Sequence, residues 1–144
     1  MLTTCYLRKG TVYFPTYGKV PGGPYRMVEP ITVVPVTDGE ALRQALRETI
    51  ARGNPKVPNL LSKDWPPPLL PQYAGVKNQT AFDRGVAVWW LYEKDGLYKI
   101  TGLKDGPIRG QVVDHEREEE FPPGTSVETV IDRMIAILQS AEAR

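Results

Sequence analysis

The stretch "GVAVWWLYEKDGLYKITGL", residues 85–103, has the pattern of a β-hairpin. Two runs rich in aromatic and β-branched residues flank Asp95-Gly96, a dipeptide that favours a tight turn with positive φ at both positions. Neighbouring side chains of a strand point to opposite faces, so at least one of Trp89 and Trp90 must face the core. We therefore expect two antiparallel strands here, joined by a two-residue turn.

Four more segments have strand composition, with frequent β-branched and aromatic residues. They span residues 2–7, 11–14, 25–36 and about 110–121. The first two flank a turn at Gly10, and residues 17–24 are expected to form a loop, because two glycines between two prolines cannot sustain strand pairing. Pro30 and Pro35 lack the amide donor of an interior strand, which predicts that their strand lies at an edge or is bulged.

Two segments have the periodicity of amphipathic helices. They span residues 37–53 and 125–143. In the first segment, Thr37 and Glu40 have the spacing of a capping box, and Gly53 provides a left-handed stop. Thr125 and Glu128 repeat the capping box in the second. Both apolar stripes are expected to face the core.

Together these elements predict an α+β fold, with a largely antiparallel sheet of about five to six strands and two amphipathic helices packed on one face. We expect residues 1–144 to form a single globular domain, because a chain of 144 residues buries roughly two thirds of its unfolded surface without disulfides. This domain includes an ordered segment at about residues 54–77, here named the Pro-rich loop.

The composition, with 41% hydrophobic and 24% charged residues, is that of a globular protein. Cys5 is the only cysteine, so no internal disulfide can form and a reducing, cytoplasmic compartment is expected. The sequence has no secretory signal pattern and no apolar run of the roughly 18 residues that a membrane span needs, so we expect no membrane partner. We also expect neither a bound metal nor an organic cofactor, because the usual motifs are missing.

The sequence also lacks the common catalytic signatures, such as a phosphate-binding loop or a nucleophile elbow. Cys5 and His115 have the chemistry of a nucleophile and a base, but a lone cysteine in an apolar strand is more typical of a core residue. An enzyme of unrecognised type is therefore the third functional interpretation. Its site would combine Lys77, Asp83, Arg84 and His115.

Charge is distributed unevenly along the chain, although the formal net charge is +1. Residues 1–63 contain nine Lys/Arg and four Asp/Glu, whereas residues 114–144 contain three and eight. Either these charges neutralise each other within the fold, or the surface has a basic and an acidic lobe that steer a charged partner.

The segment "DHEREEE", residues 114–120, concentrates the negative charge. Strand alternation would place on one face Asp114, Glu116, Glu118 and Glu120. The other face would carry His115, Arg117, Glu119 and Phe121. Four carboxylates on one face repel each other unless a positive group lies opposite. The interpretations left open are a solvated edge, a contact with a partner, and a metal ion.

The stretch "WPPPLLPQYAGVK", residues 65–77, contains three consecutive prolines, and we expect no regular helix or strand in it. A rigid, partly apolar loop loses little further entropy on binding, so it suits recognition of a partner. The alternative is a strap that covers the end of the core. Asn78 is expected to cap a single helical turn that ends at Gly85. The expected partner is another protein, contacted by Trp65, Tyr73, Lys77, Asp83 and Arg84 together with the carboxylates Asp114, Glu116, Glu118 and Glu120.

The N-terminal segments interleave basic and aromatic residues, a pattern that can bind single-stranded nucleic acid through stacking and phosphate contacts. The residues concerned are Arg8, Lys9, Tyr13, Lys19 and Arg26. Alternating tyrosines are more typical of sheet packing, and the net charge is near zero. A nucleic-acid-binding domain is therefore the second interpretation, behind protein binding.

Four phrases of the sequence resemble, as a set, a family of small, stand-alone, uncharacterised bacterial proteins. They are "LRKGTVYFPT" (7–16), "EALRQAL…IARGNP" (40–55), "YAGVK…AFDRG" (73–85) and "PPGTSVETVIDRMIAIL" (122–138). The resemblance covers nearly the whole chain and implies a single domain, but it transfers no catalytic residue. Small α+β bacterial proteins without catalytic motifs are common among immunity proteins that neutralise toxins. The leading hypothesis is a non-enzymatic protein-binding module, with an immunity or antitoxin-like inhibitor as one specific form.

Overall fold

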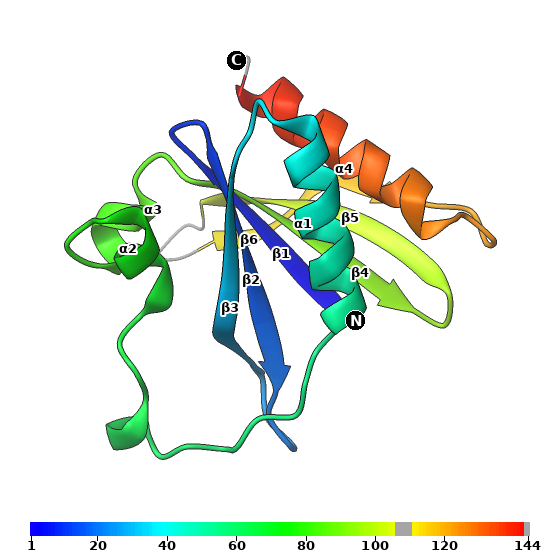
Figure 1. Ribbon diagram of the computed structural model, residues 1–144. Helices are drawn as coiled ribbons and strands as arrows, with labels where there is room; N and C mark the ends of the chain where they lie inside the picture. The colour runs from blue at the N-terminus through cyan, green and yellow to red at the C-terminus, as the bar shows by residue number, and fades with distance from the viewer. Residues whose placement is uncertain (106–110, 143–144) are drawn as a thin grey trace.

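The protein is built on one six-stranded antiparallel sheet (Figure 1). A computed structural model describes residues 1–105 and 111–142. The strands are β1 (Leu2–Arg8), β2 (Thr11–Lys19), β3 (Tyr25–Pro35), β4 (Ala87–Lys94), β5 (Leu97–Asp105) and β6 (Gln111–Glu120). They lie in the order β3-β2-β1-β4-β5-β6, so two three-stranded meanders meet where β1 pairs with β4. This arrangement confirms the predicted α+β fold and its antiparallel sheet.

The hairpin predicted from residues 85–103 is formed by β4 and β5. Asp95 and Gly96 both have positive φ, at 53° and 80°, as the sequence predicts for this turn. Pairing within the hairpin places Trp89 directly opposite Gly102. Trp89 is buried in the core, and Trp90 is 38% exposed on the other face of the sheet.

Strand β3 lies at one edge of the sheet, and its pairing with β2 is irregular at Pro15 and Thr16. Both observations agree with the edge or bulged strand predicted from its two prolines. The prediction of a loop over residues 17–24 is wrong in part, because β2 continues as far as Lys19, which pairs with Tyr25. Pairing along the whole edge strand extends β2 beyond what its own composition indicates.

Two long helices, α1 (Gly39–Arg52) and α4 (Val127–Glu142), cover one face of the sheet (Figure 1). This confirms the predicted packing of two amphipathic helices on one face. Their apolar stripes pack on the strands to form the main core. Its fully buried members include Phe14, Leu42, Leu46, Leu91, Ile100, Ile131 and Leu138.

Both helix caps differ from the predicted capping boxes by one residue. Asp38 caps α1, because its carboxylate accepts a hydrogen bond from the amide of Ala41 at 3.1 Å. Ser126 stands before α4, and its hydroxyl accepts from the amide of Thr129 at 3.2 Å. Thr37 and Thr125 therefore lie one position outside the caps. Glu128, expected to complete the second box, instead accepts two hydrogen bonds from Arg47 of α1.

Two short helices, α2 (Leu69–Ala74) and α3 (Gln79–Asp83), lie on the opposite face of the sheet from α1. Leu70 and Phe82 are buried there against Tyr13 and Ile31, in a second, smaller core. Helix α3 confirms the predicted helical turn, with the Asn78 side chain accepting from the amide of Ala81 at 2.9 Å.

Helix α2 corrects the expectation that residues 65–77 form no regular element. Pro68 precedes its first turn and Pro71 lies within it, where proline costs little because these amides have no partner in the helix. Within residues 1–105 and 111–142, no helix is long and apolar enough to cross a membrane.

Candidate functional site

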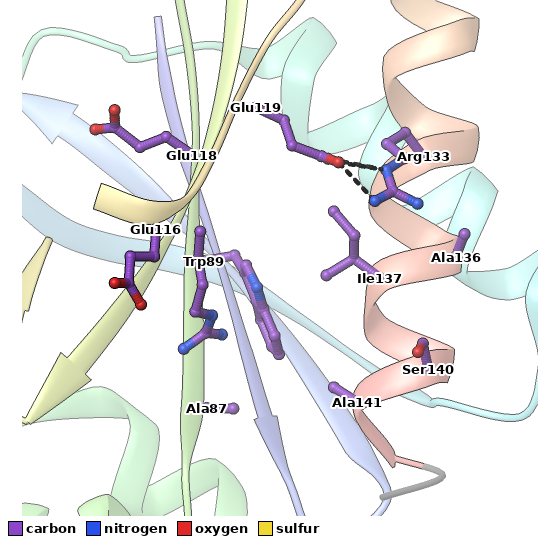
Figure 2. A pocket seen from close by; sticks show the side chains of 11 residues that line it. Ala87, Trp89, Glu116, Glu118, Glu119, Arg133, Ala136, Ile137, Ser140 and Ala141 are labelled. Carbon is purple, nitrogen blue, oxygen red and sulfur yellow. Dashed lines mark hydrogen bonds and ion pairs between the residues drawn. The ribbon is translucent and has the colours of Figure 1, made fainter. Parts of the chain in front are cut away.

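A cleft of about 530 Å³ lies between β6 and α4. Its floor includes Ala87 and Trp89 of β4 (Figure 2). The wall from α4 carries one charged side chain, Arg133. Its other side chains are small or apolar and belong to Ala136, Ile137, Ser140 and Ala141. The opposite wall is residues 116–119 of β6. We call this cavity the α4–β6 cleft.

A large bulge in β6 shapes the cleft. Thr101 pairs with Glu118 and Leu103 pairs with Val113, so residues 114–117 all lie opposite the single residue Gly102. A bulge of this kind breaks the alternation of side chains along the strand. The prediction that residues 114–121 alternate strictly between two faces is therefore wrong for the first half of this segment.

The bulge turns Arg117 inward over the sheet. Its guanidinium carbon lies 5.3 Å from the centroid of the Trp89 ring, and its Nη1 donates to the carbonyl oxygen of Leu103 at 2.9 Å. A Cβ on Gly102 would lie 2.6 Å from Nε of Arg117, so the arginine occupies the space that a side chain there would fill. Glycine in the middle of β5 is thus what allows the guanidinium to reach Trp89.

The remaining charged residues of the cleft have partners or point elsewhere. Glu119 accepts three hydrogen bonds of 2.6–3.0 Å from Arg133 of α4, and these lower the pKa of the Glu119 carboxyl. Figure 2 shows Glu116 and Glu118 directed away from α4. Glu118 lies 3.9 Å from the ammonium group of Lys99 and 3.4 Å from Nδ1 of His115.

Lysines of β5 provide the positive charge that reduces repulsion among the carboxylates of residues 114–120. Lys99 lies beside Glu118, and Lys104 lies 4.0 Å from Asp114. Glu116 and Glu120 are exposed. Among the residues that the structure describes, no group of three or more His, Cys, Asp or Glu side chains is arranged to hold a metal ion.

The Pro-rich loop presents Trp65 to solvent. The side chain is 63% exposed, and its indole N–H donates to the carbonyl oxygen of Leu60 at 3.1 Å. Three prolines follow and lead directly into α2. Trp65 and these prolines line a second cavity of about 240 Å³, whose other wall includes Arg26 and Met27 of β3. Trp65 therefore lies outside the core.

Four other predicted contact residues lie around α2 and α3. Tyr73 of α2 donates its hydroxyl to Glu29 of β3 at 2.9 Å, which raises the pKa of Tyr73. Asp83 accepts from the side-chain amide of Gln79 at 2.8 Å. Lys77 and Arg84 are exposed.

The structure divides the predicted partner-binding residues into two groups. Trp65 and Tyr73 lie beside β3, whereas the carboxylates lie on β6 at the other edge of the sheet. Five strand spacings separate these edges, or roughly 24 Å. Lys77, Asp83 and Arg84 lie on or next to α3, which packs on β1 and β2 through Phe82. The loop and the acidic strand are therefore two separate surfaces.

The basic and aromatic residues of the nucleic-acid hypothesis are partly used inside the fold. Tyr13 is only 5% exposed. Arg8 lies 5.7 Å from the ring centroid of Phe82 and donates to its carbonyl oxygen. Arg26 donates to the carbonyl oxygen of Pro58 at 3.3 Å. Lys9 and Lys19 are exposed, the first before β2 and the second at its end.

The residues of the enzymatic hypothesis lie on different elements. Cys5 is fully buried in β1, and burial raises the pKa of its thiol, which opposes a nucleophilic role. His115 is exposed on β6. Among the described residues, no hydrogen bond or ion pair joins His115 with Lys77, Asp83 or Arg84.

Sequence reasoning missed the contact between Arg117 and Trp89 and the cleft around it. One signal was present, because a glycine inside a strand pattern often marks a bulge or a close approach of another group. Gly102 is such a residue. The partner that approaches it belongs to another strand, and the register between the two strands is not visible in either segment alone.

No family model matches the sequence, and no curated protein matches it. A search of solved structures finds a protein of unknown function from Neisseria meningitidis with a similar fold. The two chains superpose with a TM-score of 0.66 at 13% sequence identity, over 97% of this chain and 93% of the other. The likeness shows that the Neisseria protein shares this fold.

Proposed function

We propose that the protein is a binding module that acts on another protein, and that it contacts this partner through the Pro-rich loop. The observation that carries the proposal is Trp65, whose ring is 63% exposed while its indole N–H is held by the carbonyl of Leu60. An exposed tryptophan whose orientation is already fixed loses little entropy when it binds. Tryptophan is also among the residues that most often dominate the energy of protein interfaces.

The surroundings of Trp65 extend this surface. Leu61 is 66% exposed next to it, and Tyr73 is 40% exposed on α2. Exposed apolar side chains that cluster on one segment are typical of interaction sites. The alternative is a strap over the core, and Leu70 at the end of the loop does cover the second core. Trp65, the largest apolar side chain of the loop, takes no part in this and stays exposed.

The specific form that we propose is an inhibitor of the immunity or antitoxin kind. Its support is the small size, the α+β fold, and the resemblance to small stand-alone bacterial proteins noted above. The exposed carboxylates of β6 would steer a basic partner toward the protein. Because β6 is far from Trp65, this strand contributes to the rate of association more than to the contact itself.

Nucleic-acid binding remains the alternative, with less support. Stacking needs exposed rings, and Tyr13 is buried. Titration with a mixed-sequence single strand at low salt checks it. We expect no binding above background, and a salt-sensitive complex weakened by Arg8→Ala would favour the alternative instead.

The test of protein binding uses the full-length protein and the products of the neighbouring genes as candidate partners, with affinity measured by calorimetry. We expect one of them to bind, and Trp65→Ala to weaken binding by about 30-fold or more, the effect of a hot-spot residue of about 2 kcal/mol. Tyr92→Ala is the matched control, because Tyr92 is an exposed aromatic residue of β4. It should leave the affinity nearly unchanged. Equal affinities for Trp65→Ala and the wild type would contradict the role of the loop.

A further inference from the structure

The α4–β6 cleft presents a guanidinium that is fixed in place and still has hydrogen-bond donors to offer. Arg117 is held by two contacts, with the ring of Trp89 and with the carbonyl oxygen of Leu103, and its guanidinium occupies the space above Gly102. Among the described residues, its only hydrogen bond is made through Nη1. The donors on Nε and Nη2 remain, and the residue as a whole is exposed.

Among the described residues, no carboxylate forms an ion pair with Arg117. Glu119 and Arg133 neutralise each other through their paired hydrogen bonds. Glu116 and Glu118 point away from α4 (Figure 2), and Glu118 lies beside Lys99. The interior of the cleft therefore favours a ligand with one negative charge near Arg117.

Apolar groups line the rest of the cleft. Ala87 and the Trp89 ring form the floor, and Ile137 and Ala141 of α4 face them (Figure 2). A volume of about 530 Å³ is within the range that small-molecule sites occupy. An inorganic anion would leave this apolar lining in contact with water.

We infer that the α4–β6 cleft binds a carboxylate carried on an apolar body, with Arg117 as the receptor of the carboxylate. A guanidinium can bind the two oxygens of a carboxylate with two parallel N–H donors. The apolar body lies between Trp89 and Ile137. The carboxylate belongs either to a small organic acid or to the C-terminus of a peptide with an apolar last residue. This site is separate from the Pro-rich loop and does not depend on the proposed function.

The experiment titrates the full-length protein with phenylacetate and follows the Nε–H signals of arginine and the indole N–H signals of tryptophan by NMR. Phenylacetamide has the same body without the charge, inorganic phosphate has the charge without the body, and a tripeptide ending in Phe represents a peptide C-terminus. We expect saturable shifts of the Arg117 and Trp89 signals with phenylacetate and weaker binding of phenylacetamide and phosphate. Tighter binding of the tripeptide would identify a peptide as the source of the carboxylate, and tighter binding of phenylacetate a small acid.

Two variants and a control complete the test. Arg117→Gln should weaken phenylacetate binding about tenfold or more, the effect of losing a charged hydrogen bond. Ser140→Phe keeps Arg117 and fills the cleft from α4, so it should abolish phenylacetate binding. This variant tests the site independently if Arg117→Gln fails to fold. Arg52→Gln removes an exposed arginine of α1 that does not line the cleft, so it should leave phenylacetate binding unchanged. The inference is overturned if phenylacetate gives no saturable shift, or if phenylacetamide or phosphate binds as tightly as phenylacetate. It is also overturned if Ser140→Phe binds phenylacetate like the wild type.

Discussion

Arg117 lies over the ring of Trp89, although the two residues belong to strands that do not pair with each other. Trp89 is on β4 and Arg117 on β6, and Gly102 of β5 lies between them. The guanidinium crosses the middle strand at the one position where no side chain stands in its way. This contact joins three strands and helps to bury Trp89, whose exposed fraction is 3%.

Replacement of Gly102 by alanine tests this relationship. The new methyl group would stand 2.6 Å from Nε of Arg117, so the arginine must leave the ring of Trp89. The displaced atoms are the flexible end of an exposed side chain, so we expect Gly102→Ala to lower the free energy of unfolding by about 1 kcal/mol, the value of the lost contact with Trp89. In an Arg117→Ala background the same change should cost much less. Equal costs in the two backgrounds, measured by urea denaturation, would show that Gly102 is needed for another reason.

The start of α1 gives a second prediction, because two adjacent residues are both able to cap it. Asp38 accepts the hydrogen bond of the Ala41 amide, whereas Thr37 lies one position earlier. We expect Asp38→Ala to destabilise the protein by about 1 kcal/mol, as is usual for loss of an N-cap. Thr37→Ala is the control and should cost clearly less. A lower melting temperature for Thr37→Ala than for Asp38→Ala would instead support the capping box predicted from the sequence, with Thr37 as the cap.

These caps illustrate how far the sequence determines the fold. The helices, the hairpin and the edge position of β3 follow from local patterns, because periodicity, turn dipeptides and proline chemistry act over a few residues. The choice between Thr37 and Asp38, or between Thr125 and Ser126, is not local. It depends on where the preceding segment leaves the sheet, and either neighbour satisfies the capping pattern.

The candidate sites were less predictable for the same reason. The exposure of Trp65 follows from the prolines beside it, which keep the chain extended. The α4–β6 cleft depends on the bulge in β6, and this bulge exists only relative to β5. The separation of Trp65 from the acidic strand depends on strand order, which places β3 and β6 at opposite edges. No pattern within either segment contains that information.

Two partly buried tyrosines, Tyr6 and Tyr17, make stability sensitive to alkaline pH. The hydroxyls of Tyr6 and Tyr17 are 2.7 Å apart, and burial raises the pKa of both above the ordinary value of 10.0. A raised pKa in the folded state means that the folded protein retains protons that the unfolded chain releases. Its contribution to stability is therefore complete below pH 10 and is lost as the pH rises further.

We expect the melting temperature of the wild type to fall steeply above pH 10. Tyr17→Phe removes one of the two ionisable groups, so its melting temperature should fall less steeply over the same range. Tyr25→Phe, at an exposed position of β3, is the control and should follow the wild type. Identical pH profiles for wild type and Tyr17→Phe would contradict the role of the hydrogen-bonded pair Tyr6 and Tyr17.

The last prediction separates the tryptophan of the Pro-rich loop from that of the core. Trp65 is 63% exposed and Trp89 is 3% exposed. Truncation of an exposed side chain usually changes stability by less than about 0.5 kcal/mol, whereas emptying a core site of tryptophan costs roughly 3–5 kcal/mol. We therefore expect Trp65→Ala to melt within a few degrees of the wild type, and Trp89→Ala to melt far lower or fail to fold.

Trp90→Ala provides an intermediate case, because Trp90 is 38% exposed on the uncovered side of β4. Its loss of stability should lie between those of the other two variants. Thermal melts of the three proteins, followed by circular dichroism, decide the order. A loss for Trp65→Ala as large as that for Trp89→Ala would mean that the loop is a strap that the fold requires. Effects of Trp65→Ala on partner binding would then reflect unfolding, and the α4–β6 cleft would become the leading candidate site.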